Sequence, residues 1–301
     1  RAIHIDFFAV FFAHMMVYHL LRVFDRPHAV DIVPALVGGS LAFLIKAPYA
    51  FYFALPLFCI AIQKQPRRSL AILIGCLSPA VVLFGLWHYH AEAVNAAEPD
   101  WFFIPGYMKH VDMGFWYYGP PAMRLDPTVW RNLLVRFMGD VTARVGALVF
   151  IGGVFVSAVA TIRGRWRRVL PLVAWLLGVL AYVVIFLNLN AVHNYYQIPF
   201  LAVSAVFMAL AIDAPVRFFG RRWRHGAAGL SVAMFAILLI ACVAFAKGRY
   251  YRRDLLREEV GQVIAENTEA GALVVLAPDL PGICFNDPTV LFRAHRFGWS
   301  L

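Results

Sequence analysis

The chain has 301 residues, of which 62% are hydrophobic, 15% aromatic and only 15% charged. Soluble domains usually carry about 25% charged residues, so this composition, with a mean hydropathy of +0.70, excludes an ordinary soluble protein. The net charge of +10 does not indicate nucleic-acid binding, because the basic residues stand in short loops between apolar runs, where they set membrane topology. The composition predicts an all-α polytopic membrane protein.

The chain begins with Arg1 rather than Met, and no signal peptide with a cleavage site precedes the first apolar run. We therefore expect a fragment whose N-terminal part is missing. Its four cysteines form no C-x-x-C pair, which gives little support to a zinc or disulfide framework.

The first predicted span covers residues 7–21, after the sequence I-H-I-D. The next apolar stretch, 32–62, is too long for one crossing of roughly 20 residues and short for two full ones. Lys46-Ala47-Pro48 interrupts it, and proline breaks a helix while lysine is costly at bilayer depth. We predict two short helices that meet at Lys46.

About seven spans are expected in total, this broken pair included. A polar and aromatic loop at 88–142 should lie on the membrane surface, with an amphipathic helix at 129–138. The remaining spans are predicted at 70–87, 145–162, 169–187, 198–212 and 227–246.

The tail differs from the rest of the chain. Residues 249–267 have the periodicity of an amphipathic helix, and 272–278 is a short apolar run typical of a buried strand. We expect the start of a small soluble α/β domain at 248–301, left incomplete at Leu301, after a transmembrane region at 1–247.

Arginine and lysine clusters give the orientation. The clusters at 22–26, 64–68, 163–168 and 217–224 fall on one side if 32–62 makes two passes, and that side is cytoplasmic. Asp6, Lys46, the 88–142 loop, His193 and the tail would then lie on the outer face.

Three outer-face features could carry chemistry. Lys46 could hold a phosphate at the outer leaflet, although its stem could simply extend to the surface. Asp6 precedes the first span, where a carboxylate could merely stabilise a helix N-terminus. The stretch H-N-Y-Y-Q-I-P-F opens the span at 198–212, and its tyrosines could handle a polar head group or form an ordinary interfacial aromatic belt.

Metal binding has weaker support. Five side chains in and near the start of the 88–142 loop could bind a divalent ion, but their spacing is generic. They are His88, His90, Glu92, Asp100 and Asp112. No cofactor is assigned with certainty, and a divalent metal ion stays open as an alternative.

The order of I-H-I-D, L-I-K-A-P and H-N-Y-Y-Q-I-P-F resembles the GT-C membrane glycosyltransferases. The similarity is greatest to the family 39 branch, which contains protein O-mannosyltransferases and lipid A aminoarabinose transferases. Residues 287–301 also look like the C-terminal segment of bacterial members.

This resemblance implies an inverting transfer of a sugar from a polyprenyl-phosphate carrier to a lipid, glycan or protein on the outer face of a bacterial inner membrane. It implies that Lys46 contacts the carrier phosphate with Tyr196, that His193 and Tyr195 line the same cavity, and that Asp6 is the catalytic candidate within this chain. The principal catalytic acid of the family lies in a loop upstream of the span near Asp6, so the fragment itself is expected to be inactive. The alternatives are a transporter or flippase of lipid-linked sugars and a non-catalytic membrane scaffold.

Overall fold

A computed structural model describes residues 5–97, 114–219, 223–251, 254–277 and 289–300. The chain divides into two compact units, Arg1–Cys242 and Val243–Leu301, so the division falls within a helix and slightly before the expected boundary at residue 247. Each unit is described by itself below.

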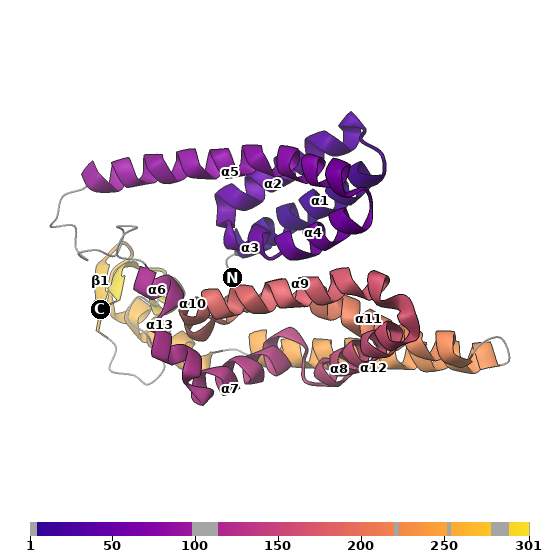
Figure 1. The fold of residues 1–301 in the computed structure, drawn as a ribbon. Coiled ribbons are helices and arrows are strands. Elements are labelled where there is room, and N and C mark those ends of the chain that lie inside the picture. The colour runs from indigo at the N-terminus through magenta and orange to yellow at the C-terminus, as the bar shows by residue number, and fades with distance from the viewer. Residues whose placement is uncertain (1–4, 98–113, 220–222, 252–253, 278–288, 301) are drawn as a thin grey trace. The chain divides into compact units, whose positions relative to one another are not determined.

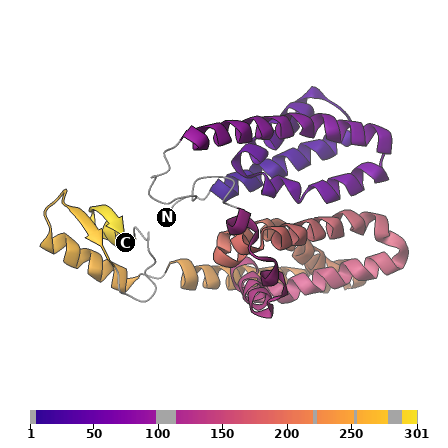
Figure 2. The same ribbon diagram turned by 60° about the vertical axis from the view of Figure 1, so that its left-hand side comes forward.

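The first unit begins with a group of helices that lie side by side (Figures 1 and 2). Helix α1 packs along α2, and α2 and α4 both pack along the long α5. These helices are α1 (Ile5–Asp25), α2 (Ala29–Lys46), α3 (Pro48–Phe51), α4 (Ala54–Gln63) and α5 (Pro66–Ala97).

The second half of this unit places α9 against α4, and α8 against α11. Two short helices, α6 and α7, precede α8, and α10 lies between α9 and α11 (Figure 1). Their bounds are α6 (Gly114–Tyr118), α7 (Pro127–Arg136), α8 (Val145–Ala160), α9 (Trp166–Ile185), α10 (Leu187–Val192) and α11 (Pro199–Phe219), followed by α12 (Arg224–Tyr250).

Six stretches of the described chain are helical, long enough and apolar enough to cross a membrane. One of them, Val145–Ile185, consists of two helices, α8 and α9. They are separate because the backbone leaves the helical conformation at Arg163 and Gly164. The prediction of an all-α polytopic membrane protein is confirmed at this level. The other five stretches are Ile5–Asp25, Ala29–Lys46, Pro66–Val94, Pro199–Phe219 and His225–Arg249.

The broken pair differs from the prediction in its lengths. Helix α2 is a full 18-residue helix that ends at Lys46, and the shorter member is the apolar run Pro48–Gln63, divided into α3 and α4. Pro48 stands in the first turn of α3, where a missing backbone N–H costs nothing. The proline thus separates two helices without shortening the first.

Two glycines allow helix backbones to touch in this unit. A Cβ at Gly178 of α9 would lie 2.2 Å from the carbonyl oxygen of Tyr52, and a Cβ at Gly153 of α8 would lie 1.8 Å from that of Phe207 on α11. Small residues at such crossings are the usual way in which membrane helices approach closely.

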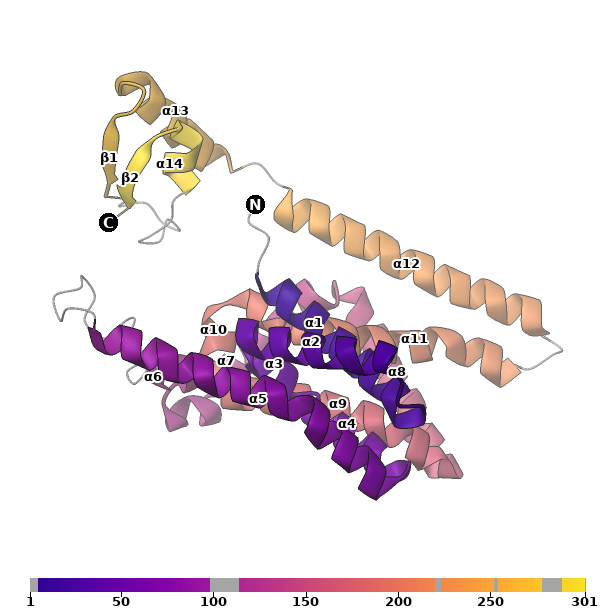
Figure 3. The same ribbon diagram turned by 90° about the horizontal axis from the view of Figure 1, so that it is seen from above.

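The second unit contains α13 (Leu255–Asn267), β1 (Leu273–Leu276), α14 (Thr289–Ala294) and β2 (Phe297–Ser300) (Figure 3). The strands pair in parallel, with Leu273 opposite Phe297, and α13 packs on α14. The expected helix therefore begins at Leu255 rather than at residue 249. That these elements belong to a soluble α/β domain stays a prediction.

Candidate functional site

Lys46 is the centre of a cluster at one end of the first unit. It occupies the last turn of α2, and only 16% of its side chain is exposed. Its Nζ donates a hydrogen bond to Oδ1 of Asp6 and lies 3.8 Å from the ring centroid of Tyr196, 4.9 Å from that of Tyr49 and 5.7 Å from that of Tyr195. The ammonium group is therefore held by one carboxylate and by the faces of three aromatic rings.

Asp6 lies in the first turn of α1 and is completely buried. The positive end of the helix dipole favours a carboxylate there, and the ion pair with Lys46 supplies the counter-charge that a buried carboxylate requires. In this arrangement Asp6 positions the ammonium group. A direct catalytic role for Asp6 stays a prediction and would require its carboxylate to become accessible.

The histidine and tyrosines of the H-N-Y-Y stretch form a stack. Helix α10 ends at Val192, His193 is extended, and Asn194–Gln197 makes a 3-10 turn before α11. The rings of His193 and Tyr195 are 4.9 Å apart, and those of Tyr195 and Tyr196 are 4.7 Å apart. The stack runs from His193 to the Lys46 ammonium.

The described part of the 88–142 segment reaches this stack. Trp116 of α6 lies 6.0 Å from His193, ring centroid to ring centroid, and its carbonyl oxygen accepts a 2.7 Å hydrogen bond from Asn188 of α10. Arg136, at the end of α7, donates to the carbonyl oxygen of Asn190. The segment is thus fixed to the cluster by aromatic and polar contacts.

The pKa of the Tyr196 phenol is raised above its ordinary value. Burial is the largest cause, and the neighbouring Tyr195 and Asp6 add to it. Burial likewise raises the pKa of the Tyr117 phenol. Both phenols are therefore neutral at physiological pH. A neutral phenol can donate a hydrogen bond to an anion.

Sequence reasoning missed two tyrosines of this site. Tyr182 of α9 donates to the carbonyl oxygen of Tyr196, and its ring lies 5.7 Å from that of Tyr49. Both stand in apolar helical runs, where a tyrosine looks like ordinary core. The spacing of Tyr49, one helical turn after Lys46, is the signal that could have indicated it.

The suggested metal ligands that the structure describes, His88, His90 and Glu92, do not gather into a site. Within the described residues no group of three or more His, Cys, Asp or Glu side chains could hold a metal ion. His88 and Glu92 pair at 3.2 Å along α5, which continues through them to Ala97, so the expected loop at 88–142 begins as a helix. Asp100 and Asp112 lie outside the described residues.

The cluster and the basic loops occupy opposite ends of the bundle (Figure 1). Helix α1 begins at the cluster with Asp6, and its last residue, Asp25, pairs with Lys64 just beyond the end of α4. Helix α11 likewise begins beside Tyr196 and ends at Phe219, and the sequence that follows contains Arg221, Arg222 and Arg224. Asp6, Lys46, His193 and Trp116 therefore share one end of the bundle.

Chemically, the arrangement can bind an anionic group. An ammonium ion has three N–H donors, one of which is used by Asp6. The others, together with phenol hydroxyls of the neighbouring tyrosines, are the donors that a phosphate oxygen prefers. No protein-family model, curated protein or solved structure matches this chain.

Proposed function

We propose that the protein binds a polyprenyl-phosphate-linked sugar at the Lys46 cluster and transfers the sugar to an acceptor on the outer face of a bacterial inner membrane. One observation carries this proposal: Lys46, Asp6, His193, Tyr195 and Tyr196 converge at the end of the bundle opposite to the basic loops. Basic loops favour the cytoplasmic side, so this end would face outward.

In the proposed reaction an acceptor hydroxyl oxygen forms a bond to the anomeric carbon of the sugar. The bond from that carbon to the phosphate oxygen breaks, and the polyprenyl phosphate leaves with the bonding electron pair. A general base takes the hydroxyl proton. By the resemblance described above, that base is the acid in the loop upstream of the span near Asp6, so the transfer test requires the protein that includes this loop. Lys46 stabilises the charge on the departing phosphate. In this proposal Asp6 holds the ammonium in place before and after the transfer.

Binding can be tested without knowledge of the sugar. The protein in lipid nanodiscs would be given radiolabelled polyprenyl monophosphate or the corresponding polyprenol, which lacks the phosphate. We expect a preference for the phosphate of roughly ten-fold or more, because a charge-assisted hydrogen bond contributes about 1.5–3 kcal/mol.

The Asp6→Asn/Lys46→Met double variant removes both charges together, so neither charge is left buried alone. We expect it to lose the preference for phosphate. The matched control is Asp25→Asn/Lys64→Met, which removes the ion pair at the opposite end of the bundle and should keep the preference. An unchanged preference in the first double variant would refute the phosphate role of Lys46.

Transfer is distinguished from transport by the product. A glycosyltransferase leaves the sugar covalently attached to an acceptor and releases free polyprenyl phosphate, whereas a flippase only moves the intact carrier between leaflets. Proteoliposomes loaded with polyprenyl-phosphate sugars would be analysed by mass spectrometry for both products. Intact carrier alone, moved across the bilayer, would favour the transporter.

A further inference from the structure

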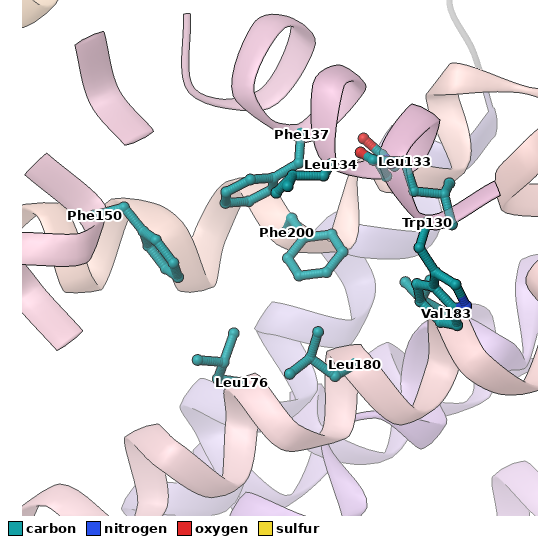
Figure 4. Close-up of a pocket in the computed structure, with 10 residues that line it drawn as sticks. Trp130, Leu133, Leu134, Phe137, Phe150, Leu176, Leu180, Val183 and Phe200 are labelled. Atoms are coloured by element: carbon teal, nitrogen blue, oxygen red, sulfur yellow. The ribbon is translucent and has the colours of Figure 1, made fainter. Parts of the chain in front are cut away.

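An apolar pocket of about 270 Å³ lies beside the Lys46 cluster, between α7, α8, α9 and α11. Figure 4 shows Phe200 facing Leu176 and Leu180 across the pocket, with Phe150 at one end and Trp130 and Val183 at the other. The volume lies slightly below the ~300 Å³ at which small-molecule sites usually begin. The pocket can hold a segment of one chain rather than a whole lipid.

The pocket follows the axis of α9. Leu176, Leu180 and Val183 form one stripe of that helix, and they cover roughly 10 Å of its length. Leu180 and Leu134 are partly exposed, at 41% and 55%, so apolar side chains at the pocket face the surroundings of a membrane-spanning bundle. A hydrocarbon chain from the bilayer can therefore enter sideways.

One polar atom in the lining lacks a partner. Gln197 is only 2% exposed, and its Nε2 donates a 3.2 Å hydrogen bond to the carbonyl oxygen of Leu133. This bond fixes the orientation of the amide and leaves Oε1 buried with no hydrogen-bond partner in the described part of the chain. The other polar group of the lining, Trp130 Nε1, already donates to the carbonyl oxygen of Arg124.

A buried acceptor without a hydrogen-bond partner destabilises the folded protein. A ligand with an N–H or O–H donor would remove that penalty. We propose that this pocket binds a single hydrocarbon chain of a lipid that carries a hydroxyl or amide N–H near its head group, and that Gln197 Oε1 accepts that hydrogen. An isoprenoid chain has no such donor, so this lipid is distinct from a polyprenyl carrier. The proposal does not depend on the function proposed for Lys46.

The position of Gln197 matches such a lipid. It directly follows Tyr196 and precedes the start of α11 at Pro199, so it lies at the same end of the bundle as the charged cluster. The donor group of the lipid would bind there, and its chain would run along α9 toward Leu176. A lipid with its hydroxyl or amide close to the head group fits this order.

The test uses two photoreactive probes that differ by one hydrogen-bond donor. N-methyl palmitamide carries an amide N–H, and N,N-dimethyl palmitamide does not; each bears a diazirine in its chain. In nanodiscs, the N–H probe should label peptides that contain residues 130–137 and 176–183. It should do so about five-fold more than the dimethyl probe, as expected for one net hydrogen bond.

Two variants distinguish the contribution of the Gln197 acceptor to labelling from that of the pocket volume. Gln197→Leu should abolish the preference for the N–H probe while labelling by both probes continues. Leu180→Trp should fill the pocket and suppress labelling there. The matched control, Leu177→Trp, changes a 51% exposed residue of the same helix outside the lining and should label like the parent.

The parent protein alone can overturn the proposal, even if Gln197→Leu fails to fold. Equal labelling of the pocket by the two probes would show a site for any hydrocarbon chain. Uniform labelling of all apolar helices would show ordinary contact with bulk lipid. A preference that survives in a folded Gln197→Leu variant would assign the donor to another acceptor.

Discussion

Asp6 and Lys46 carry opposite charges at a depth where neither charge is favourable alone. The carboxylate is completely buried, and the ammonium side chain is 16% exposed. Removal of one partner of a buried pair leaves the other charge uncompensated, whereas removal of both can be nearly neutral. The pair should therefore behave as a unit in stability measurements.

We expect Asp6→Asn and Lys46→Met each to lower the free energy of unfolding by about 3–5 kcal/mol. The Asp6→Asn/Lys46→Met variant should lose much less than the sum of the two. Equilibrium unfolding in mixed micelles would measure this double-mutant cycle. Strict additivity of the two single losses would show that the side chains do not interact in solution.

The ring of Tyr196 should matter more to stability than its hydroxyl, because the Lys46 ammonium lies over the ring face. Tyr196→Leu should lower the unfolding free energy by about 0.5–2 kcal/mol through loss of the cation–π contact, and Tyr196→Phe should retain it. Tyr89→Leu, at a 75% exposed position of α5, is the control. Equal losses for Phe and Leu at position 196 would contradict a role for the ring.

At this scale, residue type and interfacial position were enough to single out Asp6, Lys46 and Tyr196. They were not enough for Tyr49 and Tyr182, because a tyrosine within an apolar helix has the same local pattern whether it packs in a core or on a cation. That difference depends on the crossing of α3 with α9, which brings the two rings together and is not encoded in local spacing.

Among the helices, the crossing of α8 with α11 depends on a single missing methyl group. Glycine in a helix interior normally costs about 1 kcal/mol relative to alanine. At Gly153, however, an added Cβ would lie 1.8 Å from a main-chain oxygen of α11, whereas at Gly152 it would make an ordinary 3.5 Å contact with Ala211.

Gly153→Ala should therefore destabilise the protein, while its neighbour Gly152→Ala should leave stability unchanged or raise it slightly. Thermal unfolding of the purified variants, followed by helical circular dichroism, would compare them. If Gly153→Ala were as stable as Gly152→Ala, the two helices would not approach as closely as described.

Helix positions were more predictable than helix ends. The sequence indicates a break at Lys46-Ala47-Pro48, which is observed. Helix α2 nevertheless keeps its full length and ends at Lys46, and Pro48 stands in the first turn of α3. The polar residues after Trp87 predict the end of a helix there, but α5 continues to Ala97. Polar residues can end the apolar part of a helix without ending its backbone hydrogen bonds.

For the molecule as a whole, the distribution of basic residues predicts one orientation in the membrane. Leu125, in the segment that follows α6, and Ile162, at the turn between α8 and α9, are 86% and 84% exposed. Arg163, Arg165, Arg167 and Arg168 follow Ile162, so its end of the bundle should be cytoplasmic.

In a background without native cysteines, Leu125→Cys should react with a membrane-impermeant maleimide in intact cells. Ile162→Cys should react only after permeabilisation. Leu86→Cys, on the apolar part of α5, is a control for a thiol that contacts lipid and should react poorly in both states. The reverse labelling pattern would place Lys46 on the cytoplasmic side and refute transfer at the outer face.

Helix α9 contacts the Lys46 cluster through one face and lines the apolar pocket through another. On one side Gly178 and Tyr182 lie against Tyr52 and Tyr49, and on another Leu176, Leu180 and Val183 form a wall of the apolar pocket. Any translation or rotation of α9 would therefore change both the geometry of the Lys46 cluster and the width of the apolar pocket. A hydrocarbon chain bound in the apolar pocket would thus alter the surroundings of the Lys46 ammonium group without contacting it.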